Sequence, residues 1–268
     1  MLAVVLGVAL AAPAFPVDPT QTQAWRPALP AVGALRLSGS TRTEMDRDTE
    51  VLQRITVDIV VDKAGPGRVI TVRDEVADRV VQTGYGLVPE EELSALPLRS
   101  PGLRWTVEAS GEVTGVTALD LSHPSAALQA AVGTGSALQW PAPPKRVSPG
   151  DSWTHTRNAA LPIATDEVEG TLQLDLSQTA RFDGWTLIDG RACPRLTVNA
   201  TVTLGGLLRI DGYGSRMHAT GSTATEVVLD PEDGLPIWSA QRARTAVGAG
   251  EGDPRPDIVE TLVVLGRR

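Results

Sequence analysis

Apolar and polar side chains alternate along two stretches of this chain, residues 51–81 and 170–204. In a β-strand, successive side chains point to opposite faces, so a period of two marks a strand with one buried face. Each stretch therefore predicts a pair of long antiparallel strands. The apolar positions include Ile55, Val57, Ile59 and Val61 in the first stretch, and Leu196, Val198, Ala200, Val202 and Leu204 in the second.

Glycine, proline and aspartate mark the turns. Residues 64–67 (Ala-Gly-Pro-Gly) predict the hairpin of the first pair, and Asp183-Gly184 and Asp189-Gly190 predict two turns in the second. A tighter hairpin is expected around residues 110–112, and another around residues 230–234. The two parts of the chain thus match in outline, which indicates either a structural repeat or an ordinary meander.

The predicted fold is mainly β, with long antiparallel strands in a curved sheet or an open barrel and two similar halves. One short helix is expected, capped by Ser122, started by Pro124 and ended by Gly133. The predicted organisation is a signal peptide at 1–14, an extended leader at 15–33, a first β half at 34–121, a helix and Pro-rich connector at 122–148, and a second β half at 149–268.

The N-terminus predicts export. Residues 2–12 are an uninterrupted apolar run, too short for the ~20 residues that span a bilayer. It suits the apolar region of a secretory signal, with cleavage after Ala11 or Ala14, although no basic segment precedes it. A buried first strand or helix is the alternative. We therefore expect a secreted or periplasmic protein that does not span the membrane once the signal is removed.

Charge and cysteine content narrow the function further. The formal net charge is -8, and the two lysines, Lys63 and Lys145, form no basic stripe, so nucleic acid is not an expected partner. Cys193 is the single cysteine, so no intrachain disulfide can form, and it is expected to be a small buried side chain. The three histidines, His123, His155 and His218, are scattered, and no metal or other cofactor is predicted.

Two carboxylates, Asp74 and Asp78, interrupt the alternation of the first strand pair, and Glu75 lies beside them. A β-bulge near Asp74-Glu75 would shift the register and place them toward solvent. A sheet that opens to water at that end, or a functional carboxylate pair, would explain them as well. If the chain has a site, these residues are the candidates.

A second motif lies at residues 147–153, Val-Ser-Pro-Gly-Asp-Ser-Trp. Pro149 and Gly150 predict a tight turn, Asp151 can satisfy its backbone amides, and Trp153 begins a strand. Asp151, Ser152 and His155 contain the residue types of a hydrolytic triad. Side-chain alternation, however, would turn Ser152 away from the other two, and the chain has no G-x-S-x-G elbow. No catalytic residue is therefore assigned.

The Gly-Asp-Ser-Trp turn, with the later turn from Asp230 to Gly234, resembles a pattern in secreted bacterial β-rich proteins of unknown function. Those proteins are in turn distantly similar to periplasmic lipid and lipoprotein carriers. The resemblance implies a curved antiparallel sheet and an extracytoplasmic location, and it transfers no catalytic residues.

Three functions follow as hypotheses. The first is an exported non-catalytic protein that binds a lipid or other apolar ligand on a concave sheet, because the strands are long and no catalytic motif is present. The second is an envelope structural or protein-interaction module, which would need an exposed apolar patch or strand edge. The third is an enzyme, a hydrolase, for which only the carboxylates of the first strand pair or Asp151 and His155 are available.

Overall fold

The computed structural model of the chain describes residues 15–27, 29–45, 49–88, 102–109, 113–118, 141, 143, 146–164, 168–210, 213–248 and 257–267. These residues form twelve strands, so the fold is mainly β, as predicted. The strands are β1 (Gly33–Met45), β2 (Thr49–Ala64), β3 (Gly67–Thr83), β4 (Gly86–Leu87), β5 (Leu103–Val107), β6 (Val113–Ala118), β7 (Ser152–Ala164), β8 (Val168–Ile188), β9 (Arg191–Ile210), β10 (Tyr213–Leu229), β11 (Pro236–Gly248) and β12 (Asp257–Arg267).

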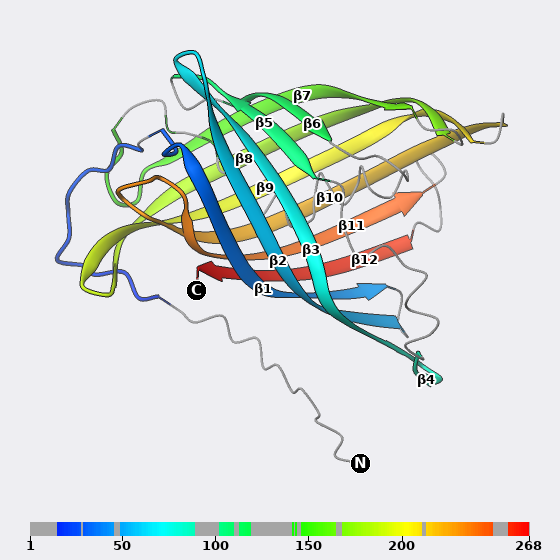
Figure 1. Cartoon of the computed structure of the whole chain (residues 1–268), viewed down its shortest axis with the longest axis horizontal. Helices are drawn as coiled ribbons and strands as arrows, with labels where there is room; N and C mark the ends of the chain where they lie inside the picture. The colour runs from blue at the N-terminus through cyan, green and yellow to red at the C-terminus, as the bar shows by residue number, and fades with distance from the viewer. Residues whose placement is uncertain are drawn as a thin grey trace.

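All twelve strands belong to one antiparallel sheet, with the order β6-β5-β3-β2-β1-β12-β11-β10-β9-β8-β7 and β4 paired to β3 (Figure 1). Each half of the chain is a meander, and the two meanders join where β1 pairs with β12. In that ladder Leu37 lies opposite Arg267, and Met45 lies opposite Val259. The first and last long strands of the chain therefore occupy the middle of the sheet.

The sheet curls strongly, and Figure 1 shows its two arms bending toward each other. Its edge strands, β6 and β7, come into contact. No ladder pairs them in the described part of the chain, so the sheet is not closed into a barrel. One face is thus directed inward and the other outward, and we call them the inward face and the outward face.

Both predicted strand pairs are hairpins of this sheet, β2–β3 and β8–β9. Ala64 pairs with Gly67 across the first turn, and Ile188 pairs with Arg191 across the second. The prediction of a turn at Asp183-Gly184 was wrong. The strand β8 continues through these residues, and the extra residue is absorbed in a bulge between Phe182 and Gly184. Gly184 has φ of 133°, a backbone conformation that glycine adopts without strain.

The predicted helix at 122–133 lies outside the described residues, as do the signal peptide at 1–14 and the turn at 110–112. The extended leader is described from residue 15. Residues 15–27 and 29–32, which we call the strap, run along one end of the sheet without forming a strand of it (Figure 1).

The strap holds the two arms of the sheet together by backbone and side-chain contacts. Trp25 forms an isolated bridge with Val147, with N–O distances of 2.7 and 2.9 Å. Arg195 on β9 donates to the carbonyl of Phe15 at 2.7 Å. Arg68 on β3 donates to the carbonyl of Pro30 at 2.9 Å. One segment therefore ties β9 in one arm to β3 in the other.

The rings of the strap reach both faces of the sheet. The ring centroids of Phe15 and Trp238 lie 5.3 Å apart on the outward face. The centroids of Trp25 and Phe182 lie 5.6 Å apart on the inward face. The hairpin turns after β2, β8 and β10 lie at the same end of the sheet, which we call the strap end. The opposite end of the sheet is the tip end.

Candidate functional site

The carboxylates of the first strand pair do not form a paired site. A bulge is present as expected, but it lies at Ala77, between the pairs Arg54–Asp78 and Ile55–Val76. Glu75 and Asp78 are exposed and lie opposite Thr56 and Arg54 on the outward face. Asp74 lies opposite Val57 in the ladder, and its side chain is outside the description. Two of the three candidates are thus solvated, which is unfavourable for a general acid or base.

The segment at 147–153 forms the predicted turn with its aromatic anchor. Gly150 has φ of 93°, and the Asp151 carboxylate accepts from the backbone amide of Ser148 at 2.8 Å. Trp153 is buried and donates from Nε1 to the carbonyl of Pro141 at 2.9 Å. Pro149, Gly150, Asp151 and Trp153 therefore have structural roles here.

The side chains of the suspected triad lie on different faces. Ser152 is exposed on the outward side of β7, whereas His155 has the inward position next to Trp153. Strand alternation therefore separates the hydroxyl from the imidazole, as the sequence predicts. Among the described residues, no group of three His, Cys, Asp or Glu side chains could hold a metal ion. Cys193 is buried, and burial raises the pKa of its thiol, the opposite of what a nucleophile needs.

The inward face divides into three zones along the strands. At the strap end it is apolar and packed, and Leu235 and the strap residue Leu29 join the strand residues there. The second zone crosses the middle of the sheet and is polar, so we call it the polar band. The third zone, the leucine patch, lies toward the tip end of β8 and β9. It consists of Leu172, Leu174, Leu176, Val202, Leu204 and Leu208, all buried.

The polar band follows one row of the ladder across six strands. Successive partners in the row are Thr225, Gln241, Val263, Thr41, Gln53 and Arg79. Thr225, Gln241 and Thr41 are buried. With its amide turned so that both ends are satisfied, Gln53 donates to Thr41 Oγ1 at 3.1 Å and accepts from Arg79 Nε at 2.8 Å. Burial lowers the pKa of Arg79.

On the other arm, outside the polar band, polar side chains of β7 and β8 border the leucine patch on the inward face. His155 lies opposite the buried Gln178, and Arg157 lies opposite Leu176. Both β7 residues have the inward parity of the buried Trp153. Burial lowers the pKa of Arg157. A guanidinium is thus placed inward at the border of an apolar surface, where charged side chains are rare.

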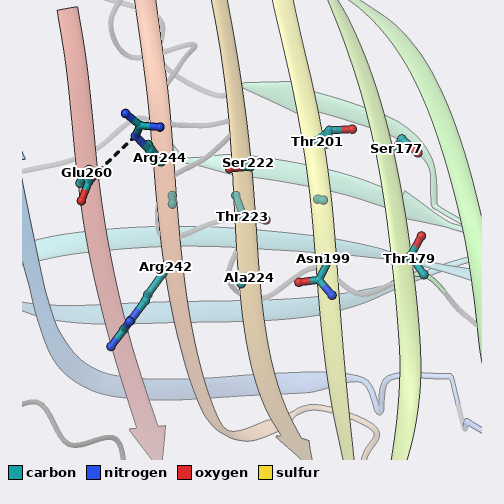
Figure 2. Close-up of a pocket in the computed structure, with 12 residues that line it drawn as sticks. Ser177, Thr179, Asn199, Thr201, Ser222, Thr223, Ala224, Arg242, Arg244 and Glu260 are labelled. Carbon is teal, nitrogen blue, oxygen red and sulfur yellow. Dashed lines mark ion pairs between the residues drawn. The ribbon is translucent and has the colours of Figure 1, made fainter. Parts of the chain in front are cut away.

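The outward face carries a hollow of about 550 Å³, which Figure 2 shows. Short side chains of β8, β9 and β10 form its floor, and Figure 2 shows arginines of β11 on one side. Its polar lining includes Ser177, Thr179, Asn199, Thr201, Ser222, Arg242, Arg244 and Glu260.

The hollow offers hydrogen bonds but little else for a ligand. Arg244 pairs with Glu260 at 3.2 Å, so these two charges neutralise each other. No aromatic ring lines it, so it has no platform on which a sugar or base could stack. The inward face therefore remains the stronger candidate for binding, because it combines apolar surface with buried polar groups.

No protein-family model matches the chain, and no curated protein matches it. The resemblance of the Gly-Asp-Ser-Trp turn to secreted β-rich proteins therefore stays a prediction. None of the described residues forms a helix long and apolar enough to cross a membrane.

Sequence reasoning missed the polar band and the position of Arg157. Of the first three inward positions of β7, only Trp153 is apolar, so the inward parity of the strand could not be read from hydrophobicity alone. A signal was available in Trp153, His155 and Arg157, which share one face of a strand at intervals of two.

Proposed function

We propose that this is an exported, non-catalytic protein that binds an amphiphile on the inward face of its sheet. The apolar chain of the ligand lies on the leucine patch, and its polar head meets the inward polar side chains of β7 and β8 beside it. The observation that carries the proposal is the inward Arg157 at the border of the leucine patch, opposite Leu176 in the ladder.

The chemistry of the border favours an anionic head group. Arg157 brings a guanidinium with five N–H donors. It can therefore bond a carboxylate or phosphate oxygen while it keeps hydrogen bonds within the protein. Hydrogen-bonding side chains lie near it in register, since His155 precedes it by two residues on the same face of β7 and pairs with the buried Gln178. An apolar surface beside such groups suits a fatty acid or a similar single-chain anion.

A pair of probes tests the proposal: a long-chain fatty acid and the fatty alcohol of the same chain length. Wild-type protein is expected to bind both, and the fatty acid more tightly. Arg157→Gln should weaken binding of the fatty acid at least about tenfold, the usual worth of a charge-assisted hydrogen bond. It should leave the affinity for the alcohol almost unchanged.

Arg242→Gln is the matched control, because Arg242 is an exposed arginine at the outward hollow. It should change neither affinity. Leu176→Ala should weaken both probes, since it removes apolar surface from the patch. Each variant is compared with wild type by its melting temperature. The proposal fails if the exported protein carries no amphiphile after organic extraction and neither probe binds.

A further inference from the structure

The most exposed apolar side chains of the described chain lie at its tip end. The four with the largest exposed fractions are Tyr85, Leu87, Leu207 and Tyr213. Tyr85 is fully exposed and Tyr213 is 78% exposed. These are the two tyrosines of the whole sequence.

They belong to two separate protrusions. The first tip, residues 83–88, is the turn between β3 and β4, and Figure 1 shows it extending beyond the sheet. The second tip is formed by the end of β9 and the start of β10, where Leu207 pairs with Arg216 and Tyr213 pairs with Ile210. Because the sheet is antiparallel throughout, the end of β3, the end of β9 and the start of β10 all lie at the end opposite the strap.

The spacing of the tips favours binding to a lipid bilayer over binding to a protein surface. Strands β2, β1, β12 and β11 lie between β3 and β10, and neighbouring strands are ~4.8 Å apart, so the tips are separated by roughly 24 Å along the curved sheet. A stable protein interface needs a contiguous area of about 800 Å² on each partner. Two isolated tips do not provide one, but each can enter a lipid head-group layer on its own.

The chemistry of the tips fits the same surface. Tyrosine is enriched at membrane interfaces because its ring is apolar and its hydroxyl stays hydrated. The first tip has no charged residue from Thr83 to Val88. The second tip carries the exposed Arg209 and Arg216, with Glu169 opposite Arg209, and its sequence also contains Asp211 between Ile210 and Tyr213. The formal charges of the two tips thus sum to zero, whereas the net charge of the chain is -8.

We infer that the tip end docks on the surface of a lipid bilayer, with the two tips inserted into the interfacial layer and Arg209 and Arg216 facing anionic head groups. The inference concerns a surface outside the inward face and holds whether or not an amphiphile is bound there. The leucine patch lies toward this same end of β8 and β9, so docking would bring the proposed ligand site next to the membrane.

Flotation of the full chain with vesicles tests the inference, using phosphatidylethanolamine with phosphatidylglycerol and, in parallel, phosphatidylcholine alone. Wild type is expected to float with both, and more strongly with the anionic vesicles. Y85S/L87S and L207S/Y213S should each lower the partition coefficient about tenfold. R209Q/R216Q should reduce only the extra binding to phosphatidylglycerol.

Leu187→Ser is the matched control, because Leu187 is an exposed leucine at the strap end and should not contribute. Nitration by tetranitromethane gives a second readout, since both tyrosines should react in the free protein and be protected by vesicles. Absence of wild-type flotation on either vesicle would overturn the inference in favour of a protein partner. Flotation of both tip variants at the wild-type level would overturn it as well.

Discussion

The two ends of the sheet differ in what their side chains do. At the strap end, aromatic rings, turns and the strap pack together, and an ion network closes the turn after β10. There Arg267 pairs with Asp230 at 3.1 Å and with Asp233 at 2.8 Å. At the tip end, Tyr85 and Tyr213 stand in solvent. The strap end is thus part of the packed core, whereas the two tips lie outside it.

The contrast indicates where amino-acid substitutions should be tolerated. Regions with few buried apolar contacts contribute little to folding stability and are free to be shaped by binding. Exposed tip residues contribute almost nothing to folding stability. Their apolar character therefore indicates a role in binding rather than in folding. Three substitutions probe how far this division of the molecule holds, and they are ordered by expected effect.

The largest effect is expected for Phe182→Ala at the strap end. Phe182 is fully buried and contacts the rings of Trp25 and Trp185. Its loss leaves a cavity, so the free energy of unfolding should fall by about 3–5 kcal/mol in urea titrations. Tyr85→Ala in the first tip should change it by less than about 0.5 kcal/mol. Equal losses of unfolding free energy at the two positions would refute the contrast between the packed strap end and the exposed tips.

A smaller effect is expected for Asp230→Ala. Asp230 is buried, and its carboxylate accepts from the Glu232 amide at 2.9 Å besides pairing with Arg267. Removing it leaves a half-buried guanidinium short of a partner, at a cost of about 3 kcal/mol in chemical denaturation. The control is Asp58→Ala, which breaks the exposed pair with Arg36 and should cost about 0–1 kcal/mol. A cost for Asp230→Ala no larger than this control would show that the network does not stabilise the strap end.

The smallest effect is a pH dependence from Cys193, which packs with Trp238 near the strap. Burial raises the pKa of its thiol in the folded state, with Asp230 and Asp189 adding to the rise and Arg191 and Arg267 opposing it. The unfolded thiol ionises first, near pH ~8.5, so the free energy of unfolding should decline above that pH. The folded and unfolded states differ by at most one proton at this thiol. The free energy of unfolding should therefore fall by at most about 1.4 kcal/mol per pH unit because of it.

Cys193→Ala supplies the comparison for this titration, because it removes the thiol and keeps a small apolar side chain. The alkaline decline should be shallower in the variant than in wild type by the share that the thiol contributes. An identical decline in both proteins would assign it to other groups.

Much of the fold could be predicted from local patterns. Alternation located the hairpins β2–β3 and β8–β9, and the Gly-Pro and Asp-Gly turns fixed two of their ends. The Asp183-Gly184 pair misled because the same two residues suit a turn and a bulge, and only the pairing of β9 decides between them. The β1–β12 ladder joins residues more than 200 positions apart, so no local sequence pattern could predict this pairing.

The candidate binding face was less predictable. The proposed site depends on Arg157 lying opposite Leu176, and the register of β7 follows from the whole sheet. The carboxylates Asp74 and Asp78 drew attention because they broke an alternation, but the bulge at Ala77 places Asp78 on the outward face, where it is exposed. Departures from a pattern therefore marked a change of register here.

The central position of β1 and β12 has a consequence for how the chain folds. Each meander can form from neighbours in sequence, but the ladder between them closes a loop of more than 200 residues. Such long-range pairing slows folding, because the entropy of loop closure is lost before the contacts form. Until residues 257–267 are in place, the two meanders present the open edges of β1 and β11, the kind of edge that invites pairing between molecules. Strand β12, which follows both β1 and β11 in the sequence, is thus the one that covers these two edges and protects the folding chain from aggregation.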